Sequence, residues 1–280
     1  MNFSMYPKKL MICVTCFFNE DRLQYLKKIS DRFSELGHEV SVYVITNTRN
    51  ESELDLINNA LSGKGFYSKI FTPHGLGHSY LLPWAHFEIV SANILDQSYT
   101  HFMYVEDDIL IKRENIEYWI NGREILRNVN LYPSFLRVEK KNGDDSWYSS
   151  DAIATSYAKH LPIVNVVDGN YSFLNLPYPY QGMYFYDREL MIEYLNSAAH
   201  TPDSGSKWLI REKATQGLTF FNFPDGFTSR NVIGYNIENK MIDSRAFIHH
   251  LPNNYANHSD KTMMNGTIKV DELIVGDLNI

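Results

Sequence analysis

Three consecutive carboxylates, Glu106, Asp107 and Asp108, follow the apolar run over residues 101–105. Such a run is typical of a buried strand, so the acids are predicted to lie at its carboxyl end. Side chains alternate along a strand, which predicts that Glu106 and Asp108 point to one side and Asp107 to the other. Neighbouring buried carboxylates repel one another unless a cation compensates, and hard divalent cations prefer oxygen ligands. The triplet therefore predicts a divalent metal site, with a solvated turn that merely ends the strand as the alternative.

The elements that must position this triplet alternate along the front half of the chain. Apolar, β-branched and aromatic runs predict strands over residues 10–18, 40–46, 68–71 and 102–106. Amphipathic patterns predict helices from residues 19–21 to Gly37, over 51–61 and over about 83–95. Short connections join these elements, which predicts an α/β fold with a Rossmann-type open twisted sheet flanked by helices. Such sheets bind ligands beyond the carboxyl ends of their strands, where the triplet lies.

The back half of the chain is less regular. Its patterns predict helices over 113–127, 187–195 and 207–220, a strand over 134–139, and extended segments near Val232 and Phe247. Polar loops are predicted over 140–151 and 203–206, and aromatic residues are dense over 171–186. No internal repeat and no clean linker interrupts the sequence, which predicts one domain spanning residues 1–280.

Composition excludes several classes of function. The 280 residues carry 26 basic and 33 acidic side chains, a net charge of −7, so a nucleic-acid partner is not expected. No apolar run is long enough for a transmembrane segment. Cys13 and Cys16 have CxxC spacing, but a strand would place them on opposite faces, so both are interpreted as core thiols. These features predict a cytoplasmic protein, with peripheral attachment to a membrane as the alternative.

The strand that ends in Glu106, Asp107 and Asp108 resembles the acidic motif of glycosyltransferases of the GT-A fold, with Glu in the first acidic place. The resemblance implies that the motif holds Mn²⁺ or Mg²⁺, which grips the diphosphate of a nucleotide-sugar. It also implies a nucleotide-binding half over about residues 9–111, an acceptor or catalytic half over about 112–260, and a C-terminal tail over 261–280. The expected metal ligands are Glu106 and Asp108, with Asp107 beside the donor.

Other donor contacts follow from the same resemblance. The loops after the first two strands would cradle the base and ribose of a UDP- or GDP-type donor. His86 would face the diphosphate. Apart from the resemblance, the aromatic stretch over residues 178–186 could contact a sugar, chiefly at Gln181 and Gly182, because glycine permits close approach of a ligand to the backbone. The loop residues concerned are Thr15, Phe17, Asn19, Thr46 and Asn47. Threonine and asparagine are common in loops of any function, and core packing explains most of the aromatic stretch around Gln181 equally well.

Two downstream motifs complete the predicted site. The resemblance implies that a late histidine returns to the metal, and His249 and His250 end a predicted strand. Alternation allows only one of them to face the site, and we favour His250. The resemblance also implies that an acid near the start of the helix predicted over 207–220 deprotonates the acceptor hydroxyl. Glu212 is the candidate base, because a carboxylate near a predicted helix N-terminus and near Arg211 could be held in position. A surface histidine pair and a solvated helix face are the respective alternatives.

Together with the acidic triplet, the resemblance implies a metal-dependent glycosyltransferase that moves a sugar from a nucleotide-diphosphate donor to a glycan or lipid-linked acceptor hydroxyl. Bacterial-type surface glycan synthesis is the expected setting, and inversion at the anomeric carbon is favoured if Glu212 is the base. A nucleotidyltransferase or phosphohydrolase would use the same acids differently. A non-catalytic sugar- or nucleotide-binding module would bind without forming product.

Overall fold

Strands and helices alternate in an α/β fold whose computed structural model describes residues 6–166, 169–203, 208–260 and 262–278. The chain divides into two compact units. The first unit comprises Met1–Arg113 and Gly182–Gly217, and the second comprises Glu114–Gln181 and Leu218–Ile280. The first unit is thus built from two separate stretches of sequence, and the second unit likewise.

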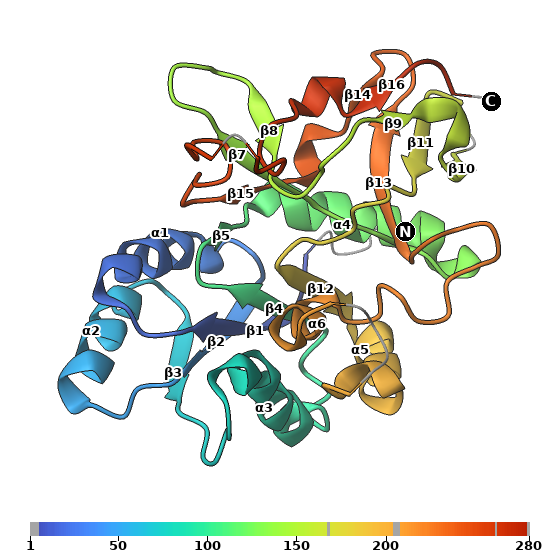
Figure 1. Ribbon diagram of the computed structural model, residues 1–280. Coiled ribbons are helices and arrows are strands. Elements are labelled where there is room, and N and C mark those ends of the chain that lie inside the picture. The colour runs from blue at the N-terminus through green and yellow to red at the C-terminus, as the bar shows by residue number, and fades with distance from the viewer. Residues whose placement is uncertain (1–5, 167–168, 204–207, 261, 279–280) are drawn as a thin grey trace. The chain divides into compact units, whose positions relative to one another are not determined.

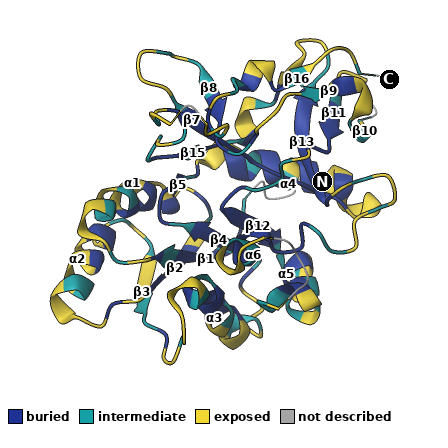
Figure 2. Ribbon diagram, in the orientation of Figure 1, coloured by how far each residue is buried: buried dark blue, intermediate teal, exposed yellow. Residues whose placement is uncertain are grey.

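The sheet of the first unit has the strand order β12-β4-β1-β2-β3 (Figure 1). Its strands are β1 (Lys9–Cys16), β2 (Glu39–Thr46), β3 (Tyr67–Phe71), β4 (His101–Glu106) and β12 (Met183–Asp187). The first four are parallel, whereas β12 runs antiparallel to β4 at the edge. β1 is almost wholly buried, because helices cover both faces of a parallel sheet (Figure 2).

Two helices of the first unit, α2 and α5, begin at residues whose side chains cap them. The Asn50 side chain accepts a hydrogen bond from Ser52 N–H at the start of α2, and Asp187 does the same for Leu190 N–H at α5. The helices are α1 (Leu23–Phe33), α2 (Glu51–Leu61), α3 (His86–Asn93), α5 (Arg188–Asn196) and α6 (Ile210–Gln216). Short 3₁₀ turns are η1 (Glu20–Arg22), η2 (Ser79–Ala85) and η5 (Ala198–His200).

The second unit combines the helix α4 (Arg113–Leu126) with short strands. An antiparallel sheet has the order β10-β11-β13-β14, and β6 adds parallel to β13. Another sheet pairs β15 parallel to β7 and β7 antiparallel to β8. The bounds are β6 (Tyr132–Pro133), β7 (Leu136–Lys140), β8 (Trp147–Ser149), β10 (Ile163–Asn165), β11 (Tyr171–Leu174), β13 (Asn231–Asn236), β14 (Met241–Ile242) and β15 (Phe247–His250).

Smaller elements complete the described chain. β5 (Ile109–Leu110) follows the acidic triplet, and β9 (Ser156–Tyr157) pairs with β16 (Ile274–Val275). The 3₁₀ turns of the second unit are η3 (Arg127–Val129), η4 (Ala158–His160), η6 (Ser244–Ala246) and η7 (Val270–Glu272). The predicted C-terminal tail therefore contributes a turn and an edge strand. Among the described residues, we find no helix with the length and apolarity to cross a bilayer.

The strands and helices predicted for the front half are confirmed, with small shifts at their ends. The helix predicted over 83–95 begins as a 3₁₀ turn that contains Pro83. The helix predicted over 207–220 is shorter, because α6 ends at Gly217, whose φ is +52° and whose Cβ would lie 2.2 Å from Tyr186 Oη. Residues 204–206 of the predicted loop, and residue 207, lie outside the described residues.

Candidate functional site

The carboxyl ends of β1, β2 and β4 bring the predicted donor residues of the first unit to one edge of the sheet. β1 lies between β2 and β4, so the chain order reverses at this point. The register places Thr15 opposite Glu106 and Cys16 opposite Thr46. A reversal of strand order in an open α/β sheet is where such folds bind ligands. The acids therefore lie at the position where a ligand is expected.

Asp107 and Asp108 share one cation, the guanidinium of Arg22 in η1. Arg22 Nη2 pairs with Asp107 Oδ1, and it lies 2.8 Å from Asp108 Oδ2. The two carboxylates are almost wholly buried, whereas the Arg22 side chain is 38% exposed. The positive charge that the triplet was predicted to need is thus supplied in part by the protein itself. An arginine held by two acids also presents N–H donors toward solvent at this edge.

The side-chain directions of the triplet differ from strict alternation. We predicted Glu106 and Asp108 on one side, but Asp107 and Asp108 both contact Arg22. The reason is that β4 ends at Glu106 and the next two residues form a turn before β5. The alternation rule applies only within a strand. The two acids that share a partner are therefore Asp107 and Asp108.

Burial raises the pKa of Asp107 to about 6, although the Arg22 guanidinium acts in the opposite direction. The thiol of Cys16 lies beside this carboxyl, and burial together with the Asp107 charge raises the pKa of the thiol. A carboxylate that the fold keeps ionised in a buried place costs stability at neutral pH. Such a cost is common at functional sites.

A pH dependence of stability follows from this shift. The folded-state pKa of Asp107 exceeds its usual value, so its ionisation destabilises the fold as pH rises from about 4 to about 6. Asp107→Asn should therefore gain stability relative to the wild type across that window, by no more than about 3 kcal/mol. Urea denaturation at pH 4 and pH 7 measures this difference. The exposed Asp55→Asn is the control, and an equal change in both variants would contradict the prediction.

Glu106 packs against the backbone of Gly182. Glu106 N–H donates to Gly182 O at 3.2 Å, and a Cβ on Gly182 would lie 2.9 Å from Glu106 Oε2. Gly182 has φ +64°, a conformation that side chains with a Cβ rarely adopt. The structure thus brings together two residues that the sequence analysis placed at the site. The preceding Gln181 belongs to the second unit, where its Oε1 accepts from Phe135 N–H at 2.7 Å.

Gly182→Ala should displace the Glu106 carboxylate. Backbone strain alone costs on the order of 1–2 kcal/mol, and the close approach to Glu106 adds to it. Gly75→Ala is a matched control, because Gly75 has φ +66° and a Cβ added there would meet no atom within 4 Å. Thermal unfolding of the two variants separates strain from contact. A loss of stability no greater for Gly182→Ala than for Gly75→Ala would show that the contact is unimportant.

The loops after β1 and β2 are joined to each other. Asn47 Oδ1 accepts from Phe18 N–H at 2.7 Å, and the Asn19 side chain caps η1 through Asp21 N–H at 2.9 Å. This cap starts the turn that carries Arg22 to the acids. Phe17 is 51% exposed between them, whereas Thr46 is fully buried. The loops therefore combine a fixed backbone with an exposed aromatic ring suited to stacking.

His86 lies in the core of the first unit. Its ring is fully buried, and its centroid is 4.8 Å from that of Tyr104 and 5.7 Å from that of Tyr184. Nδ1 lies 2.6 Å from Pro83 O, so it donates to that carbonyl. Burial lowers the pKa of His86 to about 4, which keeps the ring neutral at physiological pH. In this position the ring packs in the core, and the contact of His86 with a diphosphate stays a prediction.

Glu212 caps the helix α6. Its Oε2 accepts from Leu209 N–H at 3.3 Å, one turn before its own position. The helix itself is held by Trp84, whose Nε1 donates to Ile210 O at 2.9 Å. Glu212 is therefore fixed near a helix N-terminus, as predicted, and the cap gives it a structural function in addition to any catalytic one.

The predicted histidines lie in the second unit, on β15. His249 Nε2 is 2.8 Å from Asn253 Oδ1, and its ring contacts Trp147 edge-on. His250 is buried, and its Nδ1 is 2.5 Å from Glu139 Oε1. The two rings therefore have different surroundings, as alternation predicts. Glu106 and Asp108 belong to the first unit.

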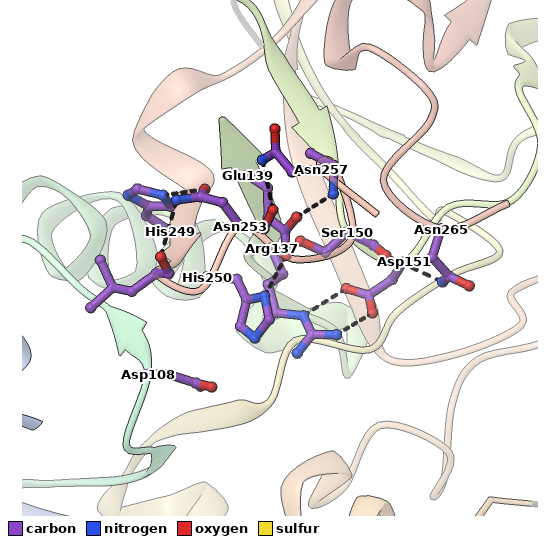
Figure 3. A network of polar contacts seen from close by, with 12 residues as sticks. Asp108, Arg137, Glu139, Ser150, Asp151, His249, His250, Asn253, Asn257 and Asn265 are labelled. Carbon is purple, nitrogen blue, oxygen red and sulfur yellow. Dashed lines mark hydrogen bonds and ion pairs between the residues drawn. The ribbon is translucent and has the colours of Figure 1, made fainter. Parts of the chain in front are cut away.

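Sequence reasoning missed the polar residues of β7 and of the loop after β8 (Figure 3). Arg137 forms a bidentate pair with Asp151, at 3.0 Å from Nε and 2.6 Å from Nη2. The guanidinium also lies over the rings of Tyr180 and Tyr255, 4.9 and 5.6 Å from their centroids. Arg137 and Glu139 alternate with buried Val138 in a predicted strand. Two charged residues on one face of such a strand are a signal that could have found this cluster.

Asp107 and Asp108, at the carboxyl end of β4, have the oxygen atoms that a divalent ion needs as ligands. Asp107 and Asp108 supply carboxylate oxygens, and Mg²⁺ typically takes one or two protein carboxylates, then phosphates and water. The residues at this edge therefore fit such an ion. Within the described parts of the chain, no three histidine, cysteine, aspartate or glutamate side chains form a metal-binding group.

No protein-family model matches the chain, and no curated protein matches its sequence. Among solved structures, the chain is similar to the mannosyltransferase PcManGT from Pyrobaculum calidifontis, determined in complex with GDP-Man and Mn²⁺. The TM-score is 0.33 and the sequence identity is 9%, over 47% of this chain and 36% of the mannosyltransferase. The chain thus matches about a third of the length of that protein, and the likeness is limited to part of each molecule.

Proposed function

We propose that the protein is a metal-dependent glycosyltransferase with a GT-A-type arrangement. It would transfer a sugar from a UDP- or GDP-type donor to the hydroxyl of a glycan or lipid-linked acceptor. The observation that carries this proposal is the buried Asp107–Asp108 pair at the point where the strand order reverses between β1 and β4. Buried acids at that place, compensated by Arg22, are suited to binding a cation and a diphosphate together.

In this proposal, different residues of the first unit bind different parts of the donor. Asp107 and Asp108 would hold the divalent ion, Mn²⁺ or Mg²⁺, which neutralises charge on the leaving diphosphate when bound. Arg22 would turn its exposed N–H groups toward the diphosphate oxygens. The loops that carry Phe17 and Asn47 would enclose the base and ribose, with Phe17 stacking on the base.

Glu212→Gln tests whether the proposed base takes the acceptor proton. The amide oxygen of glutamine can still accept from Leu209 N–H, so the cap on α6 and the stability should be retained. Loss of the base should lower kcat by about 10²- to 10⁴-fold. Steady-state kinetics and thermal unfolding of the same sample check both parts. Full activity in this variant would exclude Glu212 as the catalytic base. Our reason for favouring inversion would then be lost.

A panel of UDP-, GDP-, CMP- and dTDP-sugars, with and without Mn²⁺, tests the proposed function. We expect one donor to raise the melting temperature in a Mn²⁺-dependent way, and to release nucleoside diphosphate once a hydroxyl acceptor is added. Release of sugar 1-phosphate, with the nucleoside monophosphate transferred or set free, would instead indicate a nucleotidyltransferase or phosphohydrolase. Stabilisation without any product, across a broad set of acceptors, would indicate a binding module.

A further inference from the structure

The second unit contains a hollow of about 220 Å³, lined by residues of the helix α4, the strand β11 and the 3₁₀ turn η6 (Figure 1). A cavity of about 150 Å³ is enough to hold a benzene ring, so this hollow has room for one six-membered ring with its substituents. Asn121, Ile125 and Arg245 belong to its lining and are exposed. A solute can therefore enter the hollow from the solvent.

Three aromatic rings, those of Tyr118, Tyr171 and Phe173, contribute to the walls of the hollow. Tyr118 Oη accepts from Gly234 N–H at 2.9 Å. Tyr171 Oη donates to Asp243 Oδ2 at 2.7 Å. Because the protein itself engages both hydroxyls, these tyrosines offer the carbon surface of their rings to a ligand. Tyr171 and Phe173 lie on one face of β11, and their rings meet edge-to-face with centroids 5.4 Å apart.

Arg245 and Asn121 add polar groups to these apolar walls. Asp243 holds the Arg245 guanidinium through Nε, at 3.0 Å from Oδ1, and through Nη2, at 2.6 Å from Oδ2. The Arg245 side chain is nevertheless 50% exposed, so its orientation is fixed while other N–H donors reach the solvent. Asn121 lies on α4 one turn before Ile125, on the same helix face, and its amide has both donors and an acceptor.

The charge balance beside the hollow favours an uncharged ligand. The Asp243 carboxylate compensates the charge of Arg245, so an oxyanion would gain little net attraction there. The N–H groups of a guanidinium and an amide also bind the oxygen of a neutral hydroxyl. A pyranose has the matching structure, because its C–H groups pack on aromatic rings and its hydroxyls both donate and accept. A wholly apolar ligand would cover these polar groups without providing partners for them.

We propose that this hollow binds one sugar residue of a carbohydrate. The C–H face of the sugar packs on Tyr171 and Phe173, and its hydroxyls bind Arg245 and Asn121. That the sugar belongs to the acceptor rests on the proposed function, whereas the binding of carbohydrate does not. In that case the second unit selects acceptors that carry a glycan.

Saturation-transfer-difference NMR on the intact protein, without donor or metal, tests the binding of carbohydrate. The probes are the methyl pyranosides of glucose, galactose, mannose and N-acetylglucosamine. We expect at least one of them to receive saturation, most strongly at the C–H protons of one ring face, because that face packs on the aromatic walls. The absence of transfer to all four probes would overturn the proposal.

Variants of α4 locate the bound sugar. Asn121→Trp places a large side chain at the hollow from an exposed position and should abolish the transfer. Glu124→Trp is the matched control, because it puts the same side chain at another exposed position of α4 that does not line the hollow. Asn121→Ala removes only the amide and should weaken binding by about 5- to 10-fold, the effect of one hydrogen bond. Unchanged binding in Asn121→Trp, or an equal loss in both tryptophan variants with native circular dichroism, would overturn the proposal.

Transfer kinetics separate this inference from the proposed function. If the sugar is part of the acceptor, Asn121→Trp should raise KM for a glycan acceptor and leave kcat unchanged, since it removes binding without touching the chemistry. Loss of sugar binding with an unchanged KM would uphold the carbohydrate site and reject its role in acceptor selection. If no donor yields nucleoside diphosphate, the proposed function fails, while the NMR result still decides the carbohydrate site.

Discussion

Asp108→Asn is expected to lower the rate of sugar transfer by at least about 10²- to 10³-fold, the range typical for removing one stabilising electrostatic contact. The substitution removes one of two buried carboxylates that Arg22 holds together, but it keeps the size of the side chain. The fold should therefore persist while metal-dependent donor binding is lost. Rates of nucleoside diphosphate release and calorimetric titration of donor with Mn²⁺ measure the two effects.

Asp55→Asn provides the control for this experiment, because Asp55 is an exposed acid on α2 of the same unit. It alters net charge equally and should leave the rate near the wild-type value. Normal turnover of Asp108→Asn in the presence of EDTA would refute the metal-binding role of the acidic pair. A loss of activity accompanied by unfolding would be visible by circular dichroism, and the rate would then be measured on Asp107→Asn.

Glu139→Leu is expected to destabilise the protein by about 1–3 kcal/mol for each of the two buried donors that lose their acceptor. The change leaves His250 Nδ1 and Ala256 N–H buried without their acceptor. It also disturbs the loop that carries Ala256. Urea denaturation, followed by the fluorescence of Trp119 and Trp147 in the second unit, measures the loss.

The double variant Glu139→Leu with His250→Leu tests the cause of this loss. It distinguishes the cost of leaving the His250 donor unpaired from the loss of its attraction to Glu139. Replacing both partners by apolar groups removes most of the unpaired polar surface, so the double variant should be more stable than Glu139→Leu alone. Glu238→Ala, at an exposed turn of the same unit, should change stability by less than about 0.5 kcal/mol. A loss below about 1 kcal/mol for Glu139→Leu would contradict the prediction.

The sheet of the first unit was predictable because each strand carries its own pattern. β1 and β4 are continuously apolar, and α1 buries Leu26, Ile29 and Phe33 at helical spacing. These patterns are local, so they can be recognised in the sequence without knowing which elements pack against one another. The edge strand β12 was seen only as an aromatic stretch, because its partner β4 lies about eighty residues earlier in the sequence.

The site was predictable only where local rules apply. The position of the acids follows from the end of β4, but their pairing with Arg22 depends on a turn of η1 that the sequence does not reveal. Glu139 was missed because its partner His250 is 111 residues away. Gly217 ends α6 early through contact with Tyr186, again a distant residue. Contacts across such separations depend on topology rather than on spacing.

The first unit is built from two separate stretches of sequence, and this has a consequence for its synthesis on the ribosome. β4 has emerged long before β12, so its outer hydrogen-bonding edge stays uncovered while the intervening residues are translated. An uncovered apolar edge can recruit other nascent chains. A fragment that stops at residue 113 would keep that edge permanently, and it should therefore be more prone to aggregation than the intact polypeptide.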